Sequence, residues 1–382
     1  MLSFANDGGA QEYLTAQLDW VVLLFAFGIS MASGLLCGMY PAWEAARSSV
    51  NKTLRDQSGQ TSASIGAARV RKGLVCAQVA VSALLLIPTG LFLKSLVNLM
   101  RVDLGVKSEN LITFHVSPEL SGYKPPQSRA LFERSEAKLA AIPGVTSVTS
   151  ALVPLIAGDN WGSSLTVEGY STDQKADVHS MYNTIGGGYF GKLGIPLIAG
   201  REFSDRDTLA GPKVTVVNEQ FVKHFFGGRN PIGRKIIEGR GNVVPNVEIV
   251  GVVKDSHYSG VKQTPPRVFY TPWRQSENVG TMTFYVRTAL PTDQVIPQIR
   301  SVMKSLDSDL PVENLRTFEE QVRINIRSDQ MVLQLSAAFA VLATVLAMLG
   351  LYGVMAYSVT RRTREIGIGS RSGRREAAFG RW

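Results

Sequence analysis

One short stretch of the sequence has the residue types of a phosphate-binding loop. Residues 186–192 read GGGYFGK, which fits the first seven positions of the G-x-x-x-x-G-K pattern, whose backbone amides cradle phosphates. The eighth position is Leu193, where that pattern needs a serine or threonine hydroxyl to hold Mg²⁺. The preceding SMYNTI is compatible with a strand, so the local context permits a nucleotide site or a glycine turn before a short helix. We favour the glycine turn, because the membrane topology argued below separates this stretch from cytoplasmic ATP.

Other residue types that carry chemistry are present but scattered. Asp205 and Asp207 could pair as carboxylates, yet the surrounding EFSDRD is typical of a solvated loop. The sequence has no G-x-S-x-G nucleophile motif, and no H-x-x-x-H or cysteine pairing indicates a metal site. It therefore predicts neither an enzyme nor a bound cofactor or metal. The four histidines lie far apart along the chain: His115, His179, His224 and His257.

Three charge-free apolar runs are long enough to cross a bilayer, for which a helix needs roughly 20 residues. They extend from Trp20 to Ala42, from Gly73 to Leu93 and from Gln330 to Thr360. Pro41 predicts the end of the first helix, and Pro88 predicts a kink in the second. We expect transmembrane helices over 20–42, 73–97 and 330–360.

Small side chains recur in two of these runs. In the third run they are spaced by four, three, four and three residues, which places them on one helix face that another backbone can approach closely. In the first run, Gly34 and Gly38 form a G-x-x-x-G pair. We expect both sets to pack helix against helix, although alanine is also a common helix filler. The small stripe of the third run consists of Ser336, Ala340, Ala343, Ala347 and Gly350.

The formal net charge of +9 is confined to short segments beside the apolar runs. Residues 101–329 carry 26 Lys and Arg against 24 Asp and Glu, whereas 44–73 carry six against two and 361–382 carry seven against two. Basic flanks mark the cytoplasmic side of membrane helices, so we place the large central domain outside the cytoplasm. The charge distribution thus predicts the lipid bilayer as a partner and argues against nucleic acid.

The stretch between the second and third runs has the pattern of a folded α+β domain. LITFHV at 111–116 alternates like a strand, a helix follows between Pro126 and Ala141, and TSVTSA supplies the next strand. This β-α-β order predicts an α+β fold flanked by the three transmembrane helices. The other predicted strands are SLTVEGY, KVTVVNEQ, VEIVGVVKD, RVFYTP and MTFYVRT, with helices at QFVKHFF and from Thr292 to Leu306.

The predicted domain order follows from these runs and their flanks. In the linker after the first run, WEAAR predicts a short interfacial helix, and the Ser/Gly-rich residues 57–68 predict a flexible segment. The expected order is a short extracytoplasmic segment at 1–19, a transmembrane helix at 20–42, a basic cytoplasmic linker at 43–72, a transmembrane helix at 73–97, an extracytoplasmic domain at 98–329, a transmembrane helix at 330–360 and a basic cytoplasmic tail at 361–382.

The tail contains a motif that goes beyond the basic residues needed to fix the orientation of the helix in the membrane. Arg361, Arg362 and Arg364 fit a stop-transfer cluster, but Glu365 followed by Ile-Gly-Ile does not. The stretch RRTREIGIG resembles the post-helix motif of FtsX-type permeases, the family that includes the MacB macrolide-exporter permeases. GLLCGMYPAWEAAR, YFGKLGIPLIAGREFSDRD and NEQFVKHFFGGRNPIGR resemble other blocks of this family, so the resemblance covers essentially the whole chain.

The order of the blocks is similar to that of the duplicated permeases of acidobacteria. The resemblance implies a MacB-like periplasmic core domain, two permease units in tandem and no ATPase of its own. The sequence departs from the family at residues 369–373, where GSRSG replaces an arginine and an A-L-G-A stretch. Two further helices of the unit are also missing, so we expect an internal fragment of a longer permease.

The resemblance implies a multi-pass permease subunit of an ABC-type transporter or mechanotransmission complex in the bacterial inner membrane. A separate cytoplasmic ATPase, supplied in trans, is expected to drive motion of the periplasmic domain for efflux. Further permease helices or a second permease subunit are expected to complete the assembly. The alternative is a membrane-anchored extracytoplasmic binding or scaffold domain without ATPase coupling. The residues expected to couple to the ATPase are Arg361, Arg364, Glu365 and Gly367.

Overall fold

The computed structural model describes residues 20–47, 64–100, 102–170, 177–239 and 246–376. The chain divides into two compact units. A helical unit comprises the chain up to Gly90 and from Leu335 onward, and the core domain extends from Leu91 to Gln334. The predicted segment at 1–19, much of the predicted linker and the last residues of the tail lie outside the described residues.

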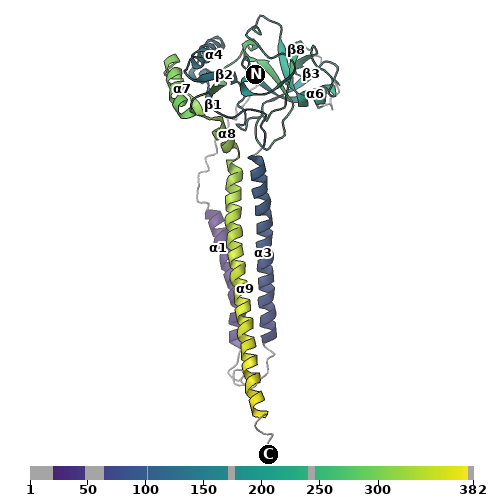
Figure 1. Ribbon diagram of the computed structural model, residues 1–382, viewed down its shortest axis with the longest axis vertical. Helices are drawn as coiled ribbons and strands as arrows, with labels where there is room; N and C mark the ends of the chain where they lie inside the picture. Colours follow the sequence, from purple (N-terminus) through teal and green to yellow (C-terminus); the bar gives the residue numbers. More distant parts are fainter. Residues whose placement is uncertain (1–19, 48–63, 101, 171–176, 240–245, 377–382) are drawn as a thin grey trace, which may run out of the picture. The chain divides into compact units, whose positions relative to one another are not determined.

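Three long helices belong wholly or largely to the helical unit: α1 (Trp20–Arg47), α3 (Ser64–Leu99) and α9 (Arg327–Glu376) (Figure 1). Two of them contain stretches long and apolar enough to cross a membrane, Val75–Leu99 and Arg327–Gly353, with mean hydropathies of 2.0 and 2.2. The apolar part found in α1, Trp20–Leu35, is shorter. The described residues therefore contain two helices of spanning length and composition, and a span over 20–42 stays a prediction.

The limits of these helices differ from the predicted ones. Helix α1 runs through Pro41 to Arg47, so the end predicted at Pro41 is wrong. Proline removes only one backbone donor, and the neighbouring turns maintain the helix. Helix α3 begins at Ser64, inside the predicted linker, and α9 continues past Thr360 to Glu376. Arginine and glutamate favour helix, so the loss of apolar character marks the edge of a membrane segment without ending the helix.

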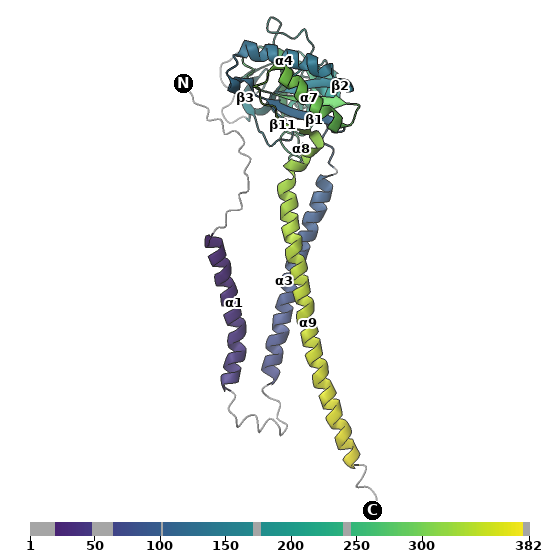
Figure 2. The ribbon, with the colours of Figure 1, turned by 90° about the vertical axis from the view of Figure 1, so that its left-hand side faces the viewer.

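The first lobe of the core domain is an antiparallel sheet covered by two helices. Its strands lie in the order β11-β1-β10-β2, and every neighbouring pair is antiparallel, as in ferredoxin-like β-α-β-β-α-β units. Helices α4 and α7 share one hydrophobic core with this sheet, built around Phe114, Phe132 and Phe284 (Figure 2). Along the chain the elements are β1 (Leu111–Val116), α4 (Pro125–Ala140), β2 (Val145–Ala151), β10 (Met282–Thr288), α7 (Thr292–Leu306) and β11 (Glu313–Thr317).

The second lobe is inserted between β2 and β10. Its strands pair in the order β4-β3-β7-β8-β6-β9, and β9 pairs in parallel with β4, so that six strands close a ring. Among the described strands of this lobe, closure pairs both edges of each ring strand, and β5 pairs with β8 outside the ring. The strands are β3 (Gly162–Val167), β4 (His179–Ile185), β5 (Leu197–Gly200), β6 (Val214–Asn218), β7 (Lys235–Glu238), β8 (Val247–Val253) and β9 (Val268–Pro272), with helices α5 (Tyr189–Leu193) and α6 (Glu219–Phe226).

The predicted strands and helices of the core domain are confirmed, and α7 has the predicted limits. Strands β5, β7 and β11 and helix α8 (Phe318–Asn325) were not predicted. The three strands have only four or five residues, and many of their side chains are exposed. They therefore lack the apolar alternation on which a strand prediction depends.

Candidate functional site

The stretch that resembles a phosphate loop is filled by the protein's own side chains. Gly188, at a φ of 66°, precedes α5, and the Glu202 carboxylate accepts hydrogen bonds from the amides of Phe190 (2.6 Å) and Gly191 (3.4 Å). Lys192 Nζ donates to the carbonyl of Gly187 at 2.8 Å. Burial raises the pKa of Glu202, and the amide hydrogen bonds oppose that rise. The position where a phosphate could bind is therefore occupied, and the glycine turn before a short helix is confirmed.

The carboxylates of the EFSDRD loop do not pair with each other. Asp207 accepts from both terminal nitrogens of Arg201, at 2.8 and 2.9 Å, and from the amide of Ser204 at 2.8 Å. Burial opposes the ionisation of Asp207, but these donors outweigh it and hold its pKa below the usual range. Asp205 is largely exposed. Among the described residues, no group of His, Cys, Asp and Glu side chains is arranged to hold a metal ion.

His115 lies on β1 within a network of hydroxyl groups. Its Nδ1 is 2.9 Å from Thr283 Oγ1, and its Nε2 is 3.0 Å from Ser117 Oγ and 2.7 Å from Thr281 Oγ1. Burial lowers the pKa of His115, because the imidazolium is poorly solvated there. Three carboxylates, on Glu313, Asp159 and Glu119, act in the opposite direction without cancelling the effect of burial. The imidazole is therefore held neutral near pH 7.

The stability of the core domain is expected to fall as the pH drops through the ordinary histidine range. The unfolded chain takes up a proton on His115 near pH 6.5, whereas the folded domain resists it until lower pH. His115→Gln removes this term, so the stability of wild type relative to His115→Gln should decrease between pH 7.5 and 5 in urea unfolding. His179→Gln, at an exposed position, is the control. Parallel pH profiles for wild type and His115→Gln would contradict the expectation.

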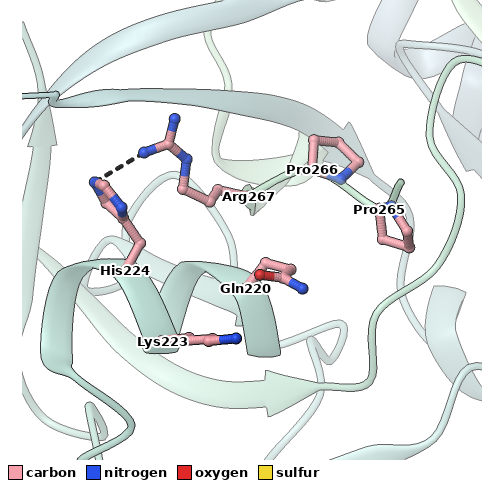
Figure 3. A pocket seen from close by; sticks show the side chains of 6 residues that line it. All are labelled: Gln220, Lys223, His224, Pro265, Pro266 and Arg267. Atoms are coloured by element: carbon pink, nitrogen blue, oxygen red, sulfur yellow. Dashed lines mark hydrogen bonds between the residues drawn. The ribbon is translucent and has the colours of Figure 1, made fainter. Parts of the chain in front are cut away.

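An open pocket of about 510 Å³ lies beside α6 (Figure 3). Arg267 and Lys223 are basic residues of its lining. One terminal nitrogen of Arg267 lies 2.8 Å from Asp177 Oδ2 and 2.8 Å from His224 Nε2, the contact drawn in Figure 3. A second carboxylate, on Asp255, accepts from the Gln220 amide at 3.0 Å. The charge of Arg267 is therefore paired with Asp177, and the geometry of the pocket assigns no ligand. The lining residues are Gln220, Lys223, His224, Pro265, Pro266 and Arg267.

Helices α3 and α9 contact each other within the helical unit through polar side chains of α3. Ser82 Oγ donates to the carbonyl oxygen of Ala343 at 2.8 Å, and Thr89 Oγ1 lies 3.3 Å from the carbonyl oxygen of Ser336. Both acceptors belong to the small stripe of α9. Hydroxyl groups that bond across two apolar helices contribute to their association. The sequence did not reveal these hydroxyls, since single Ser and Thr residues in an apolar run show no facing pattern.

The small side chains of the stripe allow α3 to approach α9 closely. A Cβ added to Gly350 would lie 2.4 Å from Gln78 Oε1, the end of a flexible side chain, so the Gln78 amide of α3 reaches the small stripe at this glycine. Ala340 is 2% exposed, which makes it the one buried hydrophobic residue among the side chains of α9 that the structure describes beyond the core domain. Ala347 is half-buried. A Cβ at Gly34 would meet open space, and the side-chain surroundings of Gly38 are not described. Packing by Gly34 and Gly38 therefore stays a prediction.

One loop of the core domain, residues 254–263, holds the segments next to both helices; we call it the junction loop. The His257 amide donates to the carbonyl of Leu104, just after α3, at 3.0 Å. The Asn325 side chain, just before α9, accepts from the Val261 amide at 3.2 Å and donates to the Ser259 carbonyl at 3.3 Å. The two chain connections of the core domain thus meet on a single loop.

Apolar contacts and an ion pair reinforce this attachment. Leu96 and Leu99, at the end of α3, pack against the larger hydrophobic core, and Ile326 is 4% exposed within it. Lys262 of the junction loop forms an ion pair with Asp329 in the first turn of α9. The pair is partly exposed, so the apolar contacts and the Asn325 amide supply most of the stability of the junction.

The four residues expected to couple to an ATPase all lie on the backbone of α9. Arg361, Arg364 and Glu365 are related by three and four residues, which places them on one face of the helix. Gly367 follows two residues after Glu365. Their side-chain surroundings are not described, so their contacts stay a prediction.

Residues 78–302 match the protein family described as the MacB-like periplasmic core domain. Over 214 residues the chain is 28% identical to the probable syringafactin export ATP-binding/permease protein SyfD of Pseudomonas syringae pv. tomato, covering 53% of this chain and 31% of that protein. It is 27% identical over 213 residues to the macrolide export ATP-binding/permease protein MacB of Burkholderia cenocepacia, covering 53% and 30%. The uncharacterized ABC transporter permease YknZ of Bacillus subtilis is 25% identical over 223 residues, covering 54% and 53%.

Among solved structures, the periplasmic region of MacB from Actinobacillus actinomycetemcomitans is 20% identical, with a TM-score of 0.37. The match covers 55% of this chain and 90% of that one. The extracellular domain of YknZ is 18% identical, with a TM-score of 0.36 and coverages of 53% and 100%. The chain spans about a third of the length of the SyfD and MacB relatives and about half of YknZ.

Proposed function

This chain belongs to the MacB-like family of ABC transporter permeases, and we propose that it converts the cycle of a separate cytoplasmic ATPase into motion of its core domain. In this proposal the core domain moves, and α9 transmits the displacement between the cytoplasmic tail and the core domain. The tail motif with Arg361, Arg364, Glu365 and Gly367 is the docking site for the ATPase. The chain itself supplies no catalytic group in this proposal.

One observation carries the proposal: α9 is a single helix from Arg327 to Glu376. It starts beside Asn325, which is bonded to the junction loop, and it includes the whole RRTREIGIG stretch. A helix of this length measures about 75 Å, at 1.5 Å per residue. An unbroken helix transmits a displacement of one end to the other with little loss, which a linker with loops does not.

The same proposal assigns the location and direction of transport. The basic flanks of α3 and α9 are cytoplasmic, and the core domain lies in the periplasm of a bacterium whose inner membrane holds the chain. Relatives are described as export proteins for syringafactin and for macrolides, which supports efflux as the process. The assembly includes further permease helices or a second permease subunit.

A charge swap in the tail tests the docking site. Arg364→Glu combined with Glu365→Arg keeps the net charge but inverts the pair, so charge-assisted bonds to an ATPase are lost. We expect at least a tenfold drop in the ATP-binding subunit recovered with the tagged chain from its own host, corresponding to about 1.4 kcal/mol or more. The equivalent swap Arg375→Glu with Glu376→Arg lies outside the motif and is the matched control.

Membrane topology is measured in the same strains with an impermeant thiol reagent, using cysteine in place of the exposed Leu120 of the core domain. Equal labelling in swap and control shows that insertion is intact. Undiminished ATPase recovery with the swapped motif would leave a membrane-anchored binding or scaffold domain as the better account. Recovery of no ATPase with any variant would point the same way.

A further inference from the structure

Each hydroxyl that joins α3 to α9 also has an acceptor within its own helix. Ser82 Oγ lies 2.9 Å from the Gln78 carbonyl oxygen, in addition to 2.8 Å from that of Ala343. A hydroxyl group has one proton and donates it to one acceptor at a time. When α9 moves away, Ser82 can therefore donate wholly to Gln78, and no donor is left unpaired in the hydrocarbon.

Thr89 repeats this arrangement two turns along α3. Its Oγ1 lies 2.7 Å from the Leu85 carbonyl oxygen and 3.3 Å from that of Ser336. The shorter distance is the intrahelical one, so the bond to α9 is the easier one to exchange. Thr344 of α9 is different, because its hydroxyl donates to the Ala340 carbonyl oxygen within its own helix, at 2.7 Å. Each of the two hydroxyl contacts described between α3 and α9 thus comes from a side chain with a second acceptor in its own helix.

The surface of α9 that faces these hydroxyls looks similar after a shift of one turn. The acceptors are backbone carbonyls, which recur along the whole helix. A displacement of about 5.4 Å replaces one small residue of the stripe by the next, for example Ala343 by Ala347 or by Ala340. The stripe presents only small side chains to α3, in contrast to the knobs that fix the register of a coiled coil. The flexible Gln78 side chain of α3, which reaches Gly350, must change its rotamer when α9 shifts.

We infer that α3 and α9 form a sliding contact, in which Ser82 and Thr89 exchange bonds between the helices for bonds within α3 as α9 shifts by up to one turn. Sliding would allow α9 to pass motion to the core domain. The biological role of the sliding contact therefore rests on the function proposed above. A shift of α9 against α3 displaces the Asn325 side of the junction loop relative to the Leu104 side. Sliding is nevertheless measurable in the absence of any ATPase.

Disulfide trapping in the full chain tests this inference. Cys37 and Cys76 are first replaced by alanine, and Ser82→Cys is combined in turn with Ala343→Cys, Ala340→Cys or Ala347→Cys. The variants are oxidised in inner-membrane vesicles from a strain without the partner ATPase. A sliding contact is expected to give all three disulfides, the displaced pairs within about tenfold of the rate of the Ala343 pair. Val341→Cys, which is 63% exposed and off the stripe, is the control and should react far more slowly.

The hydroxyl exchange has its own matched pair of variants. Thr89→Val removes the remaining bond that favours the present register, so the yield of the displaced disulfides should rise severalfold relative to the Ala343 pair. Thr344→Val removes a hydroxyl that bonds within α9 and should leave the ratio unchanged. Disulfide formation with Ala343→Cys alone overturns sliding, and so does equal reaction at Val341→Cys. If Thr89→Val leaves the yield of the displaced disulfides unchanged relative to the Ala343 pair, the role assigned to the hydroxyls is overturned. Because the vesicles contain no ATPase, these outcomes are independent of the tail-swap result.

Discussion

Replacing Asn218 with alanine is expected to destabilise the core domain by about 4 kcal/mol or more, because four hydrogen bonds converge on this 1% exposed side chain. Its Nδ2 donates to Asp255 Oδ1 and to the Pro266 carbonyl, both at 2.7 Å. Its Oδ1 accepts from the amides of Phe221 at 3.1 Å and Val268 at 2.9 Å. Asn218→Ala removes these four bonds from the interior of the inserted lobe, although Asp255 Oδ1 still accepts from the Gln220 amide at 3.0 Å. Urea unfolding of the core domain measures the loss.

Asn218→Asp separates the lost donors from the lost acceptors. The introduced carboxylate still accepts from the backbone amides of Phe221 and Val268. It also faces two acceptors, the Asp255 carboxylate and the Pro266 carbonyl, and it can donate a hydrogen bond to one of them only when it is protonated. Burial already raises the pKa of Asp255. The deficit of Asn218→Asp should therefore shrink as the pH falls from 7 to 5, whereas that of Asn218→Ala should change little. Equal pH profiles for the two variants would show that the Asn218 Nδ2 donor contributes nothing to the stability of the core domain.

The sequence located the parts of the fold that depend on local pattern. Strands β1, β8 and β10 have apolar runs with turn residues at their ends, and the spanning stretches of α3 and α9 are free of charge over more than a bilayer thickness. β11, with the sequence ENLRT, is polar and partly exposed. It forms because its backbone pairs with the edge of β1. Such a strand depends on its neighbour more than on its own residues, so local pattern misses it.

The candidate site shows the same division. The small stripe on α9 was visible from its spacing, and the RRTREIGIG motif from its residue types. The hydroxyls of Ser82 and Thr89 and the amide of Asn325 were not, because each bonds to a backbone group far away in the sequence. The helix end predicted at Pro41 was wrong, whereas the predicted membrane span over 330–360 stays a prediction within the longer helix α9. Proline and a change from apolar to basic residues end a membrane segment more reliably than they end a helix.

A second large loss of stability is expected for Gly200→Ala. Gly200 lies opposite Gly251 in the β5–β8 pair, at a φ of +75°, and an added Cβ would lie 2.1 Å from the Val250 carbonyl oxygen. The backbone cannot yield easily there, because the same carbonyl accepts from the Arg201 amide at 2.9 Å. We expect a loss of about 3–5 kcal/mol in urea unfolding of the core domain, of which the positive φ accounts for roughly 1–2 kcal/mol.

Gly227→Ala isolates the backbone strain from the steric clash. Gly227 has a φ of +60° at the end of α6, and an added Cβ meets nothing within 4 Å. It should therefore lose only the 1–2 kcal/mol of strain. Gly200→Ala should also loosen α5, since Glu202, which accepts from the Phe190 amide, follows two residues later. Hydrogen exchange at that amide should speed up in Gly200→Ala and remain unchanged in Gly227→Ala. Equal stability losses in the two variants would mean that β5 moves away from β8 at no cost, and that the close approach of the two strands does not stabilise the fold.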